Sequence, residues 1–177
     1  MRLSRFLIGF SLCVFVLVLS AIGGFLYEVA FYRIAEGQFL NRGSTFGPWI
    51  PIYAVGSLLI LAATWRVRRK PLAVFAVSCA VTAMLEFAVG YVLLHAFGVR
   101  LWDYNLEPWN WGNVGGYICF RSYVLFGFMG LIVMYAIVPA GMKLSRLLPL
   151  PAFVAISIVP GLIFLADIIA HMALKGL

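Results

Sequence analysis

The stretch Arg100-Leu-Trp-Asp-Tyr-Asn-Leu-Glu-Pro-Trp-Asn-Trp-Gly-Asn-Val-Gly-Gly-Tyr-Ile-Cys-Phe-Arg121 decides how the chain divides between membrane and water. It holds three Trp, two Tyr, three Asn, three Gly, two acids and two Arg between segments that are almost wholly apolar. It is too polar and glycine-rich to span a bilayer, and too aromatic for a disordered linker. We therefore predict an ordered connection at a membrane surface that carries part of a functional site.

The composition outside this stretch is typical of a membrane protein. Hydrophobic residues make up 64% of the 177 residues and the mean hydropathy is +1.06, whereas soluble chains are about half apolar. We predict an all-α membrane protein with a single integral membrane domain over residues 1–177. The net charge of +7 does not indicate nucleic-acid binding, because the basic residues form short clusters between apolar segments.

Five apolar stretches are predicted to be transmembrane helices, because a bilayer core of ~30 Å needs about 20 apolar residues. They cover residues 5–32, 50–65, 72–97, 118–138 and 152–174. The first is much longer than the apolar core of a signal peptide, so we expect it to be retained. The second is short, and Pro160 is expected to kink the fifth. Two ordered external loops follow the first and third spans.

The distribution of Arg and Lys predicts the orientation, because cytoplasmic loops carry the excess of positive charge. With a cytoplasmic N-terminus and an external C-terminus, the cytoplasmic side holds Arg2, Arg5, Arg66, Arg68, Arg69, Lys70, Lys143 and Arg146. The acidic residues then all lie within the membrane or on its outer side. The chemistry of the protein is thus expected to face outward.

Four ionisable residues fall inside the predicted spans: Glu28, Glu86, Arg121 and Asp167. A charge at the bilayer centre costs about 2.5–3.5 kcal/mol on insertion scales, so such groups must be paired or face water. We expect the four to converge in one outward-facing, substrate-binding polar pocket. The alternative is that Arg121 ties the helices together in a purely structural ion-pair network.

Polar and aromatic residues of the two loops are the candidate lid of this pocket. Trp102-Asp103-Tyr104 holds an anion between two large aromatic rings, and an interfacial aromatic belt accounts for others of the Trp and Tyr residues. Asn41 and Asn110 complete the predicted set of substrate-binding residues.

The sequence gives little indication of metal, cofactor or catalytic chemistry. Asp167 and His171 have the spacing of a ligand or proton-relay pair, but a histidine hydrogen-bonded at the membrane surface explains His171, and equally His95. The three cysteines lack CxxC or metal-type spacing, and no nucleophile elbow, phosphate loop or zinc signature is present. We predict no metal and no cofactor, and any ATP would be hydrolysed by another subunit.

Several short motifs carry a resemblance to a known family: Gly24-Phe-Leu-Tyr-Glu28, Phe39-Leu-Asn-Arg-Gly43, Gly47-Pro-Trp-Ile-Pro-Ile-Tyr53, Leu85-Glu-Phe with Gly90, Trp102-Asp-Tyr104, Asn110 and Ile118-Cys119. With these, residues 20–130 resemble the bacterial ABC-transporter permease family of the CmpB type, and more distantly a group of small vertebrate membrane proteins. That family usually has Asn-x-x-Gly-Arg-Ile-Cys, whereas this chain has Gly115-Gly-Tyr-Ile-Cys and then Arg121. The cation is displaced by a few residues.

The resemblance implies a multi-pass protein of the bacterial cytoplasmic (inner) membrane. The leading hypothesis is a permease, or substrate-binding membrane subunit, for a small polar or amphiphilic molecule. Its expected partners are membrane lipids and an ATPase subunit on the cytoplasmic face. Two alternatives stay open: an intramembrane enzyme acting on a lipid or lipid-linked substrate, and a non-catalytic sensor or assembly factor.

Overall fold

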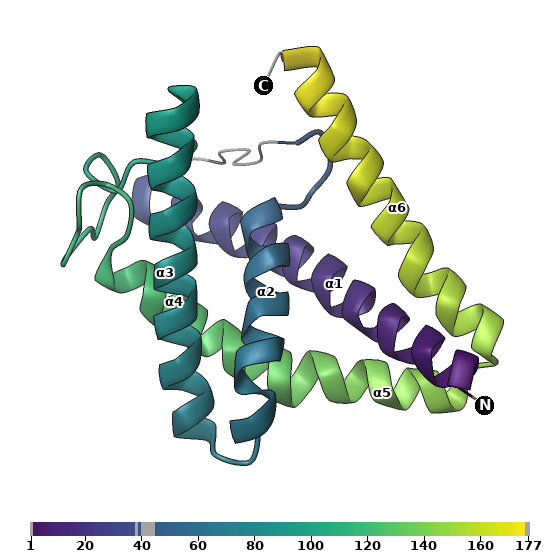
Figure 1. Ribbon diagram of the computed structural model, residues 1–177. Helices are drawn as coiled ribbons and strands as arrows, with labels where there is room; N and C mark the ends of the chain where they lie inside the picture. Colours follow the sequence, from purple (N-terminus) through teal and green to yellow (C-terminus); the bar gives the residue numbers. More distant parts are fainter. Residues whose placement is uncertain (1, 38, 40–44, 176–177) are drawn as a thin grey trace. The chain divides into compact units, whose positions relative to one another are not determined.

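The computed structural model describes residues 2–37, 39 and 45–175, and within this part the chain is helical. The helices are α1 (Arg2–Glu36), α2 (Pro51–Thr64), α3 (Pro71–Phe97), α4 (Phe120–Ile132), α5 (Val138–Leu147) and α6 (Leu150–Lys175) (Figure 1). A 3-10 turn, Trp65–Val67, follows α2, and a π-helical stretch, Val133–Ile137, joins α4 to α5. The all-α membrane fold predicted from composition is confirmed.

Among the described residues, four helical stretches are long and apolar enough to cross a membrane: Arg2–Glu36, Pro71–Phe97, Phe120–Leu147 and Leu150–Leu174. These match four of the five predicted spans. The remaining one, α2 with its 3-10 turn, is a shorter apolar helix over Pro51–Val67. Its 14 α-helical residues rise only ~21 Å at 1.5 Å per residue, which is less than the thickness of a bilayer core.

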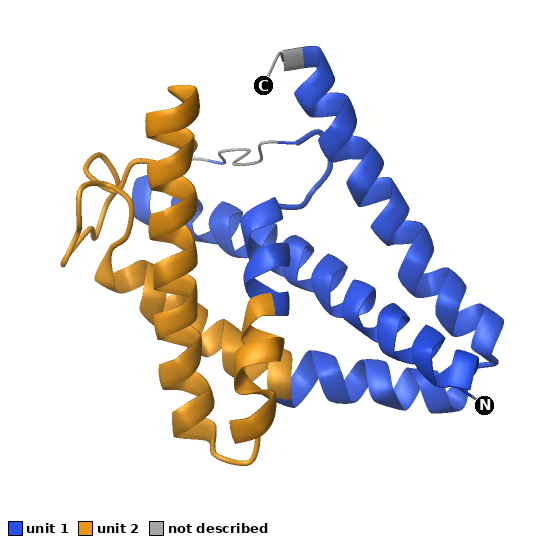
Figure 2. Cartoon of the chain, viewed as in Figure 1, with its two compact units in different colours: residues 1–58, 135–177 blue, residues 59–134 orange. Residues whose placement is uncertain are grey.

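The chain forms two compact units (Figure 2). Unit 1 comprises residues 1–58 and 135–177, and unit 2 comprises residues 59–134. In unit 1, α1 packs against α6 and α5. In unit 2, α3 packs against α4, and the loop 98–119 connects them.

Glycines permit the close approach of helices in both units. A Cβ at Gly130 of α4 would lie 2.6 Å from the Ser78 Cβ of α3, and one at Gly161 of α6 would lie 2.5 Å from Val14 of α1. Small residues at helix contacts are typical of membrane proteins, where van der Waals packing and not the hydrophobic effect drives association.

The described acids of unit 1 lie away from the end of the unit that carries most of its basic residues. α1 begins, and α5 ends, at the end of the unit where α6 starts (Figure 1). Arg2, Arg5, Lys143 and Arg146 lie in these terminal turns, whereas the acids Glu28 and Asp167 lie many turns further along α1 and α6. Four basic residues thus lie at this end, and Arg33 and Lys175 lie in the last turns of α1 and α6 with the acids. The excess of positive charge agrees with the sidedness expected from the positive-inside rule. The orientation of the whole chain in a membrane stays a prediction.

Two adjacent glycines of α1 test the packing of unit 1. A Cβ at Gly24 would overlap the ring of Tyr53, whereas one at Gly23 has nothing within 4 Å. We expect Gly24→Ala to destabilise the protein by about 1–3 kcal/mol through overpacking. Gly23→Ala should be neutral or stabilising by up to about 1 kcal/mol, because alanine favours the helix. Thermal unfolding in detergent measures both, and equal effects would contradict the packing of α2 on α1.

Candidate functional site

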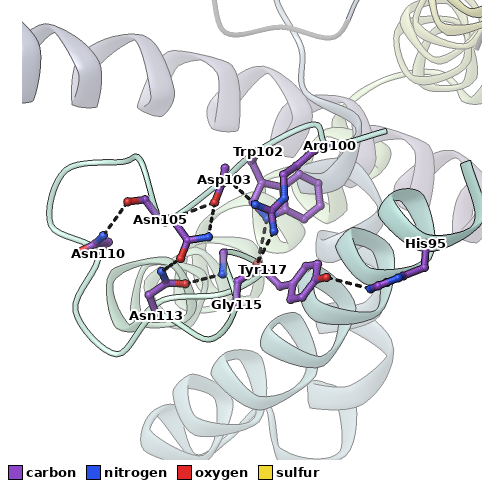
Figure 3. Close-up of polar contacts among 10 residues, drawn as sticks. His95, Arg100, Trp102, Asp103, Asn105, Asn110, Asn113, Gly115 and Tyr117 are labelled. Atoms are coloured by element: carbon purple, nitrogen blue, oxygen red, sulfur yellow. Dashed lines mark hydrogen bonds and ion pairs between the residues drawn. The ribbon is translucent and has the colours of Figure 1, made fainter. Parts of the chain in front are cut away.

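The loop 98–119 of unit 2 is folded by its own hydrogen bonds (Figure 3). Tyr104 N–H donates to the Gly116 carbonyl at 3.0 Å, and Trp102 Nε1 donates to the Tyr117 carbonyl at 2.9 Å. Gly116 has φ +80°, and a Cβ there would collide with the side chains of Asp103 and Asn105. The loop is therefore an ordered element, as predicted from its aromatic and glycine content.

Asp103 organises the exposed side of this loop. Its carboxylate accepts the backbone N–H and the side-chain amide of Asn105, at 2.9 and 2.8 Å, and pairs with Arg100. Arg100 also donates to the Gly115 carbonyl at 2.8 Å. The pKa of Asp103 is lowered, first by the hydrogen bond from the Asn105 N–H and then by the hydrogen bond and charge of Arg100. Asp103 was predicted either to orient the loop by binding backbone amides or to line the mouth of a pocket, and its hydrogen bond with the Asn105 N–H agrees with the first alternative.

Asn110, another predicted site residue, belongs to the same network. Its amide donates a weak hydrogen bond of 3.5 Å to the carbonyl of Asn105. Asn113 donates to the Asn105 side chain at 2.7 Å and accepts the Gly116 N–H at 2.8 Å. The three asparagines thereby connect the two halves of the loop.

Tyr104 links the loop to the membrane-spanning helices. The side chain is buried, and its hydroxyl donates to the Glu86 carboxylate of α3 at 2.9 Å. The hydroxyl of Ser122, on α4, donates to the other Glu86 oxygen. Burial, and next the negative charge of Glu86, raise the pKa of Tyr104 well above its usual range. The tyrosine therefore stays protonated and serves as a donor.

Arg121 has an acidic partner in the loop. Its guanidinium lies 2.8 Å from the Glu107 carboxylate, with both side chains largely buried, and 5.6 Å from the centroid of the Tyr104 ring. Glu86, Tyr104, Glu107, Arg121 and Ser122 form what we call the Glu86 cluster. Two acids and one arginine meet there, beneath an ordered loop and against the spanning helices α3 and α4.

Two acids of unit 1, Asp167 and Glu28, are engaged in the same manner. Asp167 of α6 accepts the N–H groups of Phe46 and Gly47, at 3.2 and 2.8 Å, and the indole N–H of Trp49 at 2.5 Å. Glu28 of α1 accepts the hydroxyl of Tyr53 at 2.7 Å. Each carboxylate thus holds a loop or a helix start next to its own helix.

The predicted site residues are distributed over both units. Glu28 and Asp167 lie in unit 1, and the pair Glu86 and Arg121 lies in unit 2 with Trp102, Asp103, Tyr104 and Asn110. A single pocket that combines all four intramembrane charges stays a prediction. Asn41 lies outside the described residues.

Both histidines have protein contacts. His171 is buried, with its ring 5.1 Å from that of Phe46, so its prediction as a surface histidine was wrong. His95 is exposed, and its Nε2 lies 3.2 Å from the hydroxyl of Tyr117. Within the described part of the chain, no three His, Cys, Asp or Glu side chains are grouped as a metal site would require.

Sequence reasoning did not select Glu107, Ser122, Trp49 or Tyr53 as site residues. Glu107 precedes Pro108 in a polar loop, which suggests a solvated acid, and Ser122 has no distinguishing neighbour except Arg121. One sequence pattern could have drawn attention to these loops: an acid on a helix is followed, in two places, by a loop that contains Pro-Trp or Trp-Asp-Tyr.

The fold and the site define a multi-pass, all-α membrane protein with buried ionisable groups beneath ordered loops. A family model, ABC_trans_CmpB, described as "Putative ABC-transporter type IV", matches residues 14–172. The chain belongs to this family, which confirms the resemblance seen in its motifs. Comparisons with curated proteins and with solved structures gave no match.

The Tyr104–Glu86 hydrogen bond predicts a measurable coupling. Tyr104→Phe removes one donor to a buried carboxyl, and we expect a loss of about 1–3 kcal/mol in unfolding free energy. In the background of Glu86→Gln the same change should cost less, which a double-mutant cycle in detergent detects. Tyr91→Phe, at an exposed tyrosine of α3, is the control. Additive effects of the two substitutions would contradict the bond.

The Asp167 contacts predict how firmly the segment 45–49 is held. Asp167→Asn retains the shape but loses the charge that strengthens three hydrogen bonds. We expect the amides of Phe46 and Gly47 to exchange hydrogen about 10- to 100-fold faster. This corresponds to a decrease of about 1.5–3 kcal/mol in the free energy of local opening. Hydrogen-exchange mass spectrometry measures this. Glu36→Gln, at an exposed acid of the same unit, should leave the exchange unchanged.

Proposed function

We propose that the protein is the permease, or substrate-binding membrane subunit, of an ABC-type transport system in a bacterial cytoplasmic membrane. The family membership supports an ABC-related role. The observation that carries the proposal further is the Glu86 cluster, in which Arg121 and Glu107 form a largely buried ion pair next to a buried glutamate. Ionisable groups at membrane depth are expensive and mostly mark substrate or ion pathways.

The Glu86 cluster has the chemistry to bind a small polar or amphiphilic molecule. Arg121 can bind an anionic group, the two carboxyls can accept hydrogen bonds, and the Tyr104 ring can contact an apolar portion. Trp102, Asp103 and Asn110 would act through the loop that places Tyr104. In this proposal Asp103 and Asn110 position the site, and Glu86, Tyr104 and Arg121 contact the substrate.

An ATPase partner would bind at the turn between α2 and α3. This turn contains Arg66, Arg68, Arg69 and Lys70, all of them exposed. Arg68 donates to the Trp65 carbonyl at 2.7 Å, and its guanidinium lies 4.6 Å from the centroid of the Trp65 ring. A basic turn held in this way suits an acidic surface on a cytoplasmic subunit.

Copurification with an ATPase tests the proposal. The tagged full-length protein, extracted in mild detergent from its native bacterium, should retain an ATPase subunit that mass spectrometry identifies. Neutralising Arg66, Arg69 and Lys70 together with glutamine should reduce the retained ATPase at least tenfold, because each contributes to attraction and docking. Purification without an ATPase, but with a phospholipid bound at Arg121 and Glu86, would instead support a lipid enzyme.

Arg121 distinguishes a functional cluster from a structural one. Arg121→Ala leaves Glu107 without this cation, so we expect both stability and permease-dependent ATP hydrolysis to fall, the latter at least tenfold. The double variant Arg121→Ala/Glu107→Ala removes both charges and should recover much of the stability. Recovery of ATP hydrolysis in the double variant would show that the pair is structural only. Reconstituted proteoliposomes provide the measurement.

A further inference from the structure

The helix α5 has two distinct faces. Val138 and Gly141 are buried, and a Cβ at Gly141 would lie 3.0 Å from the Phe15 ring of α1. On the opposite face, Pro139, Met142, Lys143, Arg146 and Leu147 are exposed and line a shallow hollow of about 340 Å³. Their spacing of three and four residues places them in one stripe along the helix. This stripe, the α5 hollow, combines two cations with three apolar side chains.

The segments of unit 1 at the end where α5 finishes carry basic residues and no acidic ones among the described residues. All six acids of the chain are elsewhere in the sequence: Glu28, Glu36, Glu86, Asp103, Glu107 and Asp167. The closest in sequence, Asp167, is on α6, ~25 Å along the helix from its start at 1.5 Å per residue. Arg2 and Arg5 begin α1 at the same end of the unit. Lys143 and Arg146 are therefore available to an external anion.

The place of the hollow along the chain indicates which anion fits. It lies in the final turns of the continuous apolar stretch Phe120–Leu147, where a helix of spanning length leaves the hydrocarbon. Anionic headgroups lie at this depth, and the acyl chains begin just below them. Lys143 and Arg146 match a phosphodiester, and Pro139, Met142 and Leu147 match the start of an acyl chain. A free phosphate would make no use of the apolar side chains.

We propose that the α5 hollow is a binding site for an anionic phospholipid, with the phosphodiester held by Lys143 and Arg146. The proposal is independent of transport and concerns a different surface from the Glu86 cluster. A phospholipid in this position adds counter-charge to the acid-free end of unit 1. It would also fill the exposed side of α5, whose other side packs on α1.

Native mass spectrometry of the full-length protein in detergent tests the site. Titration with phosphatidylglycerol and with phosphatidylcholine of the same chain length should show binding of the anionic lipid at least tenfold tighter. The variant Lys143→Gln/Arg146→Gln should reduce phosphatidylglycerol affinity about tenfold or more and leave phosphatidylcholine unchanged. The matched control Arg69→Gln/Lys70→Gln removes the same charge from an exposed turn of unit 2 and should leave both affinities unchanged.

Three outcomes would overturn the proposal. Equal affinity for the two lipids would show that the headgroup charge is not recognised. An equal loss in the control variant would show that only net charge matters. If inorganic phosphate displaced the bound lipid at the same concentration as a short-chain phosphatidylglycerol does, the site would be assigned to a free anion. Met142→Ala/Leu147→Ala should weaken lipid binding and not phosphate binding. All six substituted side chains are exposed, so unchanged thermal unfolding verifies that each variant is folded.

Discussion

The structure depends on how carboxylates are accommodated on helices that face hydrocarbon. An ionised carboxylate without donors at that depth is strongly unfavourable, so each of these acids needs N–H or O–H groups from another segment. Glu86 receives the hydroxyl of Tyr104 from the loop that follows α3, and Asp167 receives backbone and indole N–H groups from the segment before α2. The carboxylates therefore hold the loops in place, and the loops provide the hydrogen bonds that lower the free-energy cost of burying the carboxylates.

The same requirement explains why aromatic residues accompany each acid. Tyr104 and Trp49 present a polar donor on a large apolar body, so they satisfy the carboxylate and exclude water with one side chain. The Trp49 ring also packs against Phe164, with the ring centroids 5.6 Å apart. Phe164 lies one turn before Asp167 on α6. Smaller polar residues would provide the donor without the packing. Both units reach this solution separately.

Sequence analysis predicted five spanning helices, of which four are long and apolar enough in the structure, and it predicted the ordered loop 98–119, because hydropathy, charge and composition are read directly from local residues. It did not predict the partners, since these are distant along the chain: Asp167 and Trp49 are 118 residues apart, and Glu86 and Ser122 are 36 apart. Helix contacts at Gly130 and Gly161 were missed for the same reason. The short α2 was recognised as short, but its apolar composition favoured a full span.

The contacts of the Glu86 cluster also constrain how a permease could use them. Arg121 already pairs with Glu107, and Glu86 already accepts the Tyr104 hydroxyl. If the cluster binds a substrate, an anion at Arg121 would compete with the loop carboxylate of Glu107, and a donor at Glu86 would compete with the Tyr104 hydroxyl. Either exchange removes an anchor that holds the loop 98–119 to α3 or α4. In the proposed function, occupancy of the cluster would thus be linked to release of the loop through the same hydrogen bonds, because a ligand shifts an equilibrium by its differential affinity for the two states.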